Sequence, residues 1–313
     1  MLKNPLQSHQ TLEKAYAALG RVPLFEGVRR DNVEIEPLGS LTNSSYKITT
    51  SGGAYVLRLP GDSTSEYIDR VAEEHNSRIA AAAGVGAEVV YFDTMTGAMV
   101  SRFIQGVNMD NDHFHQDPEA PARAALVLRR VHGIGPVFKY RFNAFGMIDH
   151  YLDLLRGMRM PPPEGYYGVE KRMEAVRQAL EVLPASLASC HNDPWPPNFI
   201  DTGSRMYLID WEFSGMNDPY WDLAHLSVEA GFGAGQDHAM MQAYTDGAAT
   251  LESYSRLELY KATSDLHWSL WALVEHASGN TTFDFRAYSQ RRFDACRARI
   301  DTTDFGRSLA AVR

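Results

Sequence analysis

Cysteine is almost absent from this chain, since Cys190 and Cys296 are the only two among 313 residues. Two thiols give no disulfide framework, which excludes the small disulfide-dependent secreted scaffolds and indicates a reducing compartment. Long apolar runs are missing as well. None reaches the roughly 18 residues of a membrane-spanning helix, and the first residues lack the apolar core of a signal peptide. We therefore expect a cytoplasmic protein without membrane insertion.

Basic residues are outnumbered: 30 Lys and Arg stand against 39 Asp and Glu, for a net charge of −9. This balance argues against nucleic acid or an anionic membrane as the main partner and is compatible with a small cationic ligand. The content of 44% hydrophobic and 22% charged residues is that of an ordinary globular protein, large enough for one domain or two lobes. The sequence leaves the oligomeric state open, a dimer included.

The first hundred residues predict a sheet with one inserted helix. Short apolar runs bounded by turn residues predict strands at 33–37, 45–49, 54–59, 89–92 and 98–103. Between the third and fourth runs, a helical apolar period predicts a helix over 65–83. We expect residues 1–104 to form a small nucleotide-binding domain on this mixed antiparallel sheet.

Helical periods prevail after Gly106, so the predicted fold class is α+β, with a larger, mainly helical domain over 105–313 that carries catalysis and acceptor binding. Asp117 is expected to cap the first of these helices, with Pro118 in its first turn. The predicted helices span 118–132, 145–156, 169–183, 221–230, 236–245, 255–276 and 285–300.

A segment between these helices carries the most informative pattern, His191-x-Asp193-x-x-x-x-Asn198, and Asp210 follows at the end of an apolar strand. Phosphoryl transfer from a nucleotide uses such a set, because one carboxylate accepts the proton of the acceptor hydroxyl while an amide oxygen and a second carboxylate hold magnesium. We predict Asp193 as the catalytic base, with Asn198 and Asp210 as metal ligands nearly opposite each other in a hairpin that turns at 203–204. A polar loop without chemistry is the alternative.

Four separated stretches, 39–48, 55–61, 191–198 and 209–212, resemble the choline/ethanolamine kinase family, above all its bacterial members. The resemblance extends from about residue 35 to residue 300. It implies the two-lobed protein-kinase-like fold of the wider group of aminoglycoside-phosphotransferase-like kinases, and the use of ATP and Mg²⁺.

On the nucleotide side, the resemblance gives Arg58 a catalytic, phosphate-holding role with Glu73 as its partner and Glu74 as the second choice. Arg58 lies in an apolar strand, where an unpaired charge is costly, although an arginine turned to solvent from an edge strand is the alternative. The expected nucleotide contacts are Ser40, Thr42, Asn43, Arg58, Glu73, Ser101, Phe103 and Ile104.

On the acceptor side, a helix carries aromatic and acidic residues along one stripe, at Asp265, Trp268, Trp271 and Glu275. Tryptophan faces attract a quaternary ammonium by cation–π interaction, at about 0.5–2 kcal/mol per ring, although an aromatic stripe of this spacing is as a rule part of a core. The resemblance favours a substrate site formed by Trp268 and Trp271 and adds Glu212 and Glu229.

His191 and Asp222 are expected to act behind the reacting atoms. The His191 ring would hold the loop through hydrogen bonds, and Asp222 resembles the family's aspartate that hydrogen-bonds this loop from below. Cys190 has no base implied for it, so a buried structural thiol is a better interpretation than a nucleophile. Three features depart from the family: Phe213 replaces a tyrosine that is common after the Asp-x-Glu, the pair Pro196-Pro197 precedes Asn198 where glycine is frequent, and the segment 230–233 is poorer in aromatic residues.

The predicted function is a kinase that transfers the γ-phosphate of ATP to the hydroxyl of a small amino alcohol, choline first and ethanolamine second. The alternatives are a kinase of the same fold for an aminoglycoside, methylthioribose, homoserine or thiamine and, from another class, a catalytically inactive nucleotide-binding regulator. Intact Arg58, Asp193, Asn198 and Asp210 argue against the regulator. The sequence does not decide between ATP and GTP.

Overall fold

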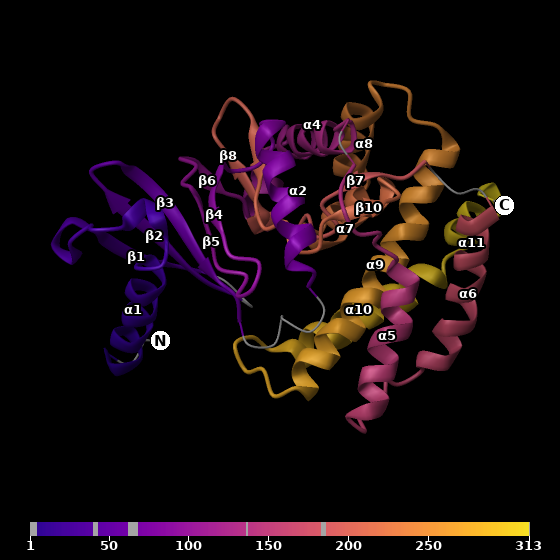
Figure 1. Ribbon diagram of the computed structural model, residues 1–313. Helices are drawn as coiled ribbons and strands as arrows, with labels where there is room; N and C mark the ends of the chain where they lie inside the picture. Colours follow the sequence, from indigo (N-terminus) through magenta and orange to yellow (C-terminus); the bar gives the residue numbers. More distant parts are fainter. Residues whose placement is uncertain (1–4, 40–42, 62–67, 136, 183–185, 313) are drawn as a thin grey trace. The chain divides into compact units, whose positions relative to one another are not determined.

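The computed structural model describes residues 5–39, 43–61, 68–135, 137–182 and 186–312, with side chains from residue 12 onward. The chain divides into two compact units, Met1–Gln105 and Gly106–Arg313, and Figure 1 shows their elements. Antiparallel strands form the centre of the first unit, and helices dominate the second. The predicted α+β class is confirmed.

The first unit is built on a five-stranded antiparallel sheet with the strand order β1-β2-β3-β5-β4. Its strands are β1 (Glu34–Leu38), β2 (Ser44–Thr50), β3 (Gly53–Leu59), β4 (Val89–Phe92) and β5 (Met99–Arg102). β2 and β3 form a hairpin in which Thr50 pairs with Gly53. Gly53 has a φ of +124°, which a residue with a side chain rarely adopts. Each strand ends within one residue of its predicted bounds.

Two helices lie on opposite faces of this sheet. α1 (Pro5–Leu19) places Leu19 in one apolar cluster with Leu57 of β3. Successive residues of a strand point to opposite faces, and the next residue, Arg58, contacts Glu73 of α2 (Arg70–Ala82). The short 3₁₀ helices η1 (Pro23–Phe25) and η2 (Arg30–Asn32) follow α1.

The sequence predicts one helix in this unit, and the structure corrects that prediction twice. α1 is an additional helix, whose buried Leu19 packs on a sheet that lies far along the chain. The predicted helix, α2, begins at Arg70 and not at residue 65, because residues 68 and 69 are not helical. The carboxylate of Asp69 caps it by accepting the N–H groups of Val71 and Ala72 at 3.0 Å each.

Helices make up most of the second unit. They are α3 (Asn111–Gln116), α4 (Ala120–His132), α5 (Ala144–Gly157), α6 (Tyr166–Val182), α7 (Tyr220–Glu229), α8 (Ala234–Thr245), α9 (Leu251–Ala277), α10 (Phe285–Ile300) and α11 (Thr303–Ala311). α9 is buried on all sides over most of its length and packs against α5, α7, α10 and α11. It forms the centre of this unit (Figure 1).

Two of these helices, α3 and α11, are not among the predicted ones, and a third starts later than expected. α4 begins at Ala120, two residues after Pro118, although the Asp117 carboxylate still accepts the N–H of Glu119 at 2.9 Å. α11 starts at the capping residue Thr302, whose hydroxyl accepts a backbone N–H at 3.1 Å. Among the residues that the structure describes, no helix combines the length and the apolar character needed to cross a bilayer.

Two small sheets complete the second unit. β6 (Val107–Asn108), β8 (Phe199–Asp201) and β9 (Met206–Leu208) form one, in the order β6-β8-β9, while β7 (Ala188–Cys190) pairs with β10 (Gly215–Asn217). Phe199 pairs with Leu208 across β8 and β9, so the predicted hairpin and its turn at 203–204 are confirmed. The loop from β7 to β8, with the 3₁₀ helix η4 (Pro196–Asn198), thus lies beside the end of β9.

Candidate active site

The loop that joins β7 to β8, residues 191–198, is held by unusual backbone geometry. Asn192 has a φ of +68°, a left-handed conformation that is uncommon outside glycine. The turn of η4 then closes through the N–H of Asn198, which donates to the carbonyl of Trp195 at 2.8 Å. The prolines before Asn198 suit the first positions of this turn, where no backbone N–H is required.

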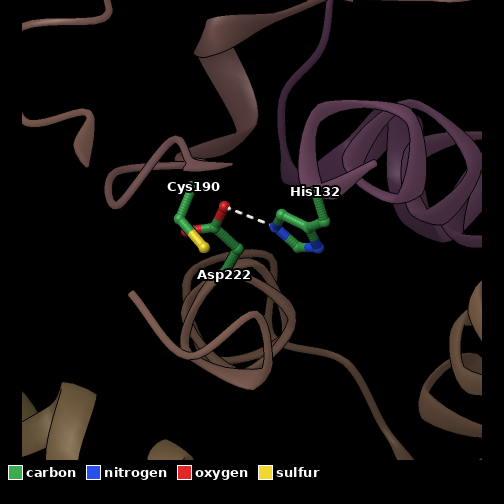
Figure 2. A group of neighbouring side chains, drawn as sticks. All are labelled: His132, Cys190 and Asp222. Carbon is green, nitrogen blue, oxygen red and sulfur yellow. Dashed lines mark hydrogen bonds and ion pairs between the residues drawn. The ribbon is translucent and has the colours of Figure 1, made fainter. Parts of the chain in front are cut away.

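Asp222 of α7 fixes the start of this loop from behind. Its two carboxylate oxygens accept the consecutive N–H groups of His191 and Asn192, at 2.8 Å each. His132, the last residue of α4, lies 2.9 Å from the same carboxylate through Nε2 (Figure 2). Burial alone would raise the pKa of Asp222, but the hydrogen bonds from His132 and the loop outweigh it and lower that pKa.

His132, Cys190 and Asp222 lie close enough to suggest a metal site (Figure 2). Their hydrogen bonds indicate a structural cluster instead. Both nitrogens of His132 are engaged, one by Asp222 and the other by Tyr244 Oη at 2.9 Å. Burial raises the pKa of the Cys190 thiol well above its ordinary value, and its S–H donates to the carbonyl of Asn217. Because a thiol must ionise to bind metal or attack a substrate, Cys190 is suited to neither role.

His191 connects the loop to the residues that precede Asp210. Its Nε2 lies 2.8 Å from the carbonyl of Ile209, and its Nδ1 accepts the backbone N–H of Asp193 at 3.3 Å. The ring also packs against Trp211, with ring centroids 4.6 Å apart. Both ring nitrogens are therefore used to hold the backbone, which suits the structural role expected for His191.

The Asp193 side chain is 22% exposed and lies among other carboxylates. Burial raises its pKa well above the ordinary value, His191 opposes this shift, and the negative charges of Asp210, Glu229 and Asp222 add to it. A carboxylate with a raised pKa is a stronger base. The same concentration of negative charge would favour a bound cation.

Asn198 and Asp210 lie at the open end of the β8–β9 hairpin. The Asn198 side-chain amide donates to the carbonyl of Asp193 at 3.0 Å, which leaves its Oδ1 as the atom suited to a metal. In the hairpin register Asn198 faces Ile209, whose N–H donates to its carbonyl at 3.0 Å, so Asp210 stands one residue from the directly opposite position, nearly opposite Asn198 as predicted. Asp210 has a φ of +67°, an energetically costly conformation of the kind found at functional sites. A carboxylate and an amide oxygen are donors that fit Mg²⁺.

On the acceptor side, Glu229 is the last residue of α7, the helix that also carries Asp222. Its carboxylate accepts the hydroxyl of Tyr288 and lies 3.5 Å from Arg292, which also lies 3.2 Å from Asp265. Burial would raise the pKa of Glu229, but the Arg292 charge outweighs it and lowers that pKa. The structure therefore pairs this predicted substrate residue with an internal cation.

Trp268 and Trp271 are buried, with 4% and 8% exposure. Trp268 stacks on His225 with ring centroids 5.0 Å apart and meets Phe213 edge-on at 5.8 Å, while Trp271 lies 5.1 Å from Trp268. Among the residues that the structure describes, the indole N–H groups of both tryptophans have no hydrogen-bond partner. His225 in turn contacts Asp193 at 3.0 Å, so the stripe packs in the interior directly behind the candidate base.

The two other acidic residues considered for the acceptor side, Glu275 and Glu212, differ in their burial. Glu275 is 2% exposed and accepts a hydrogen bond from Asn280 at 2.8 Å, so its carboxylate is engaged within the fold. Glu212 is half-buried and stands at the turn that follows Asp210.

In the first unit, Arg58 forms a buried ion pair with Glu73, and its guanidinium also donates to the carbonyl of Gly97 at 3.3 Å. Arg58 is 4% and Glu73 1% exposed, which excludes an arginine directed to solvent. Glu74, the second choice, pairs instead with Arg78 at 3.0 Å.

The other predicted nucleotide contacts lie at the same sheet. Asn43 and Ser101 are buried, at 8% and 6% exposure, and the N–H of Phe103 donates to the carbonyl of Ala54 at 3.0 Å, next to Ile104. The predicted contacts Ser40 and Thr42 lie outside the described residues.

Comparison with known proteins decides the family. Residues 34–260 match the phosphotransferase enzyme family. A solved choline/ethanolamine kinase family protein from Mesorhizobium loti is 44% identical, with 97% of this chain and 99% of that chain covered and a TM-score of 0.87. This chain belongs to the choline/ethanolamine kinase family. The choline kinase LicA of Streptococcus pneumoniae is 26% identical, with 96% and 99% covered and a TM-score of 0.78. Protein LicA of Haemophilus influenzae is 26% identical over 266 residues, which are 82% of this chain and 97% of that protein.

As a member of this family, the protein is an ATP-dependent phosphotransferase.

Three residues beside its site carry no role in the sequence prediction: His225, Tyr288 and Arg292. A signal for His225 was available, because Asp222, His225 and Glu229 are three and four residues apart and share one face of α7. Arg292 is identified only by its burial at 5% exposure beside Glu229.

Proposed function

We propose that this kinase transfers the γ-phosphate of ATP to the hydroxyl of a small amino alcohol, choline first and ethanolamine second. A bond forms between the acceptor oxygen and the γ-phosphorus, the bond from that phosphorus to the β–γ bridging oxygen breaks, and ADP leaves. Asp193 accepts the hydroxyl proton. The observation that carries the proposal is the position of Asp193, half-buried among carboxylates in a loop that Asp222 and His191 fix, where burial raises its pKa.

Asn198 and Asp210 would hold the magnesium through Oδ1 and a carboxylate oxygen. The hydrogen bond from the Asn198 amide to the Asp193 carbonyl, 3.0 Å long, supports this role, because it orients the amide and ties the ligand to the base. Magnesium, when bound, offsets the negative charge of the phosphates. A site of hard oxygen donors is what Mg²⁺ prefers.

The nucleotide would bind to the first unit, as the proposed nucleotide-binding domain over 1–104, while 105–313 carries catalysis and acceptor binding. A LicA structure of 26% identity and TM-score 0.73 was solved in complex with AMP, which supports a nucleotide site in this family. The Glu73 carboxylate holds the Arg58 guanidinium in place, so Arg58 could contact phosphate oxygens without losing its buried partner. Backbone and side-chain contacts are proposed for Ser40, Thr42, Asn43, Ser101, Phe103 and Ile104.

For the acceptor, we assign Trp268 and Trp271 to the recognition of the ammonium group, with Glu212 and Glu229 as the acidic residues near it. Arg292 and Tyr288 already engage the Glu229 carboxylate, which weakens its attraction for a second cation. The aromatic faces would therefore contribute more of the recognition, and cation–π attraction amounts to about 0.5–2 kcal/mol per ring.

An acceptor panel tests this function. Purified protein with MgATP is supplied with choline, ethanolamine, kanamycin, methylthioribose, homoserine or thiamine, and the phosphorylated product is detected by mass spectrometry. We expect the highest kcat/KM with choline and none with the Asp193→Ala variant. Preference for kanamycin or another panel member would contradict the assigned acceptor. Nucleotide binding without any phosphorylated product would favour a regulator.

A further inference from the structure

We propose that His225 is a positioning residue for Asp193: its imidazole donates a hydrogen bond that fixes one carboxylate oxygen and leaves the other directed at the acceptor hydroxyl. The inference rests on the proposed function, in which Asp193 is the base. Neither the loop motif nor the resemblance to the kinase family assigned His225 a role.

The geometry that carries this proposal is a chain of side chains within the second unit. His225 Nε2 lies 3.0 Å from Asp193 Oδ1, and His225 Nδ1 lies 3.0 Å from Ser264 Oγ on α9. His225 is 1% exposed, so water does not compete for its nitrogens. One helical turn separates it from Asp222 on the same face of α7. Asp222 thus fixes the loop backbone, and His225 fixes the side chain that the loop presents.

The protonation of the ring follows from its partners. An ionised carboxylate only accepts hydrogen bonds, so Nε2 must carry the proton that points to Asp193. Nδ1 is then an acceptor, and Ser264 donates its hydroxyl hydrogen to it. The ring plane is held by near-parallel packing on Trp221, at 6.3 Å and 10°, and on Trp268, at 5.0 Å and 24°.

A neutral donor suits a catalytic base better than a cation does. Burial lowers the pKa of His225 to about 4, so the ring is uncharged near neutral pH. An arginine or lysine in this position would bring a full positive charge and lower the basicity of Asp193. The neutral imidazole restricts the rotation of the carboxylate while Asp193 keeps its raised pKa. Ser264 supports the Nε2–H tautomer by donating to Nδ1, and Trp268 holds the ring plane.

A kinetic comparison of matched variants tests the role. His225→Phe keeps a ring of similar size for packing but removes the donor. We expect kcat to fall about 10- to 100-fold, since a hydrogen bond to a charged group is lost, while the KM values for ATP and acceptor stay within about 3-fold. His225→Gln, whose side-chain NH₂ can reach the position of Nε2, should recover most of kcat. Ser264→Ala should lose about 5-fold.

Thr263→Val is the matched control, because Thr263 is buried next to Ser264 and its hydroxyl donates to the carbonyl of Leu259 within the same helix, at 2.9 Å. Its kcat should equal that of the wild type. A wild-type kcat in His225→Phe beside an inactive Asp193→Ala contradicts this inference alone. An inactive wild type across the whole acceptor panel contradicts the proposed function and this role with it.

A spectroscopic measurement tests the tautomer without turnover. Selective ¹⁵N labelling of histidine, with the His225 signals assigned by their loss in His225→Gln, distinguishes a protonated Nε2 from a protonated Nδ1. We expect the Nε2–H form in the wild type and in Ser264→Ala, and a mixture of tautomers in Asp193→Ala, which lacks the carboxylate that accepts this proton. An Nδ1–H form in the wild type overturns the donor role whatever the kinetics show.

Discussion

The side-chain amide of Asn198 donates a hydrogen bond to the main-chain carbonyl of Asp193 over 3.0 Å. This bond links the proposed metal ligand to the proposed base through the short turn of η4. It also determines which atom of Asn198 can reach a cation. The side-chain nitrogen is engaged by the Asp193 carbonyl, so the side-chain oxygen, Oδ1, is the atom suited to a metal. The base and the metal ligand are therefore positioned by one piece of backbone, and the variants below separate their roles.

Replacement of Asp193 by Asn removes the proton acceptor but keeps the shape of the side chain. We expect kcat to fall by about 100-fold or more, in line with the usual contribution of general base catalysis, while ATP still binds. Turnover is measured by ADP release in the presence of choline, and binding by calorimetry with MgATP. Undiminished turnover in Asp193→Asn would contradict the assignment of Asp193 as the catalytic base.

Asp210→Ala should separate metal binding from proton transfer. Loss of this carboxylate leaves Asn198 as the remaining predicted ligand, so nucleotide affinity should become insensitive to magnesium. Calorimetry with ATP, with and without Mg²⁺, gives that difference for the wild type and the variant. The matched control is Asp201→Ala in β8, whose carboxylate pairs with Arg123 at 2.6 Å and carries no proposed metal role. Equal MgATP affinity in Asp210→Ala and the wild type would contradict the assignment.

Local features of the site were predictable from the sequence. The hairpin after Asn198 follows from a glycine turn between two apolar runs, and its register is the predicted one. The pairing of Arg58 was expected because an apolar strand cannot hold an unpaired charge, and Glu73 is its partner. These inferences depend on spacing and on the energetics of burial, both of which the sequence contains.

Contacts between distant segments were not predictable in the same way. His225 meets Asp193 across 32 residues, and Arg292 meets Glu229 across 63 residues on another helix. These pairs arise from the packing of α7 and α10 on α9. The spacing of residues within one helix does not reveal how that helix packs on another. The start of α2 was also not predicted from the sequence. The helix begins at Arg70, five residues after the predicted position, because the Asp69 carboxylate caps it by accepting two N–H groups.

The Arg58–Glu73 pair provides a test with an internal control one residue away. Glu73→Gln removes the buried carboxylate that pairs with both Arg58 and Arg70, which should lower the free energy of unfolding by about 3–5 kcal/mol and raise the KM for ATP. Glu74→Gln removes a pair with Arg78 whose side chains are 30% and 46% exposed, so the expected loss is below about 0.5 kcal/mol. Thermal unfolding and ATP kinetics measure both. Equal melting temperatures for the two variants would contradict a structural role for the buried pair.

The tryptophan stripe can be tested with a charged and a neutral acceptor of the same shape. Trp271→Phe weakens cation–π attraction while keeping a ring against Trp268, so the KM for choline should rise about 3- to 10-fold. The KM for 3,3-dimethylbutan-1-ol, which carries a carbon in place of the ammonium nitrogen, should change much less. Equal changes for both acceptors would indicate that Trp271 acts through packing alone.

His267 gives a pH dependence of stability that one substitution isolates. It is fully buried beside Tyr151 and Trp221, and burial, aided by His225, lowers its pKa from 6.5 to about 3. The unfolded chain takes up a proton below about pH 6.5 while the folded chain does not, so this histidine makes stability fall as the pH drops from about 6.5 toward 3. Between pH 7 and 5 the loss should be on the order of 2 kcal/mol.

His267→Phe should remove that loss, so urea unfolding of the variant should depend less on pH between 7 and 5 than that of the wild type. Subtracting the pH dependence of the variant from that of the wild type cancels the titration of Asp193 and Asp222, which both proteins share. Tyr151→Phe is the control for repacking, because it alters the same aromatic cluster without a group that titrates in this range. It should keep the wild-type slope. If His267→Phe also keeps that slope, then His267 takes up its proton in the folded chain as readily as in the unfolded one.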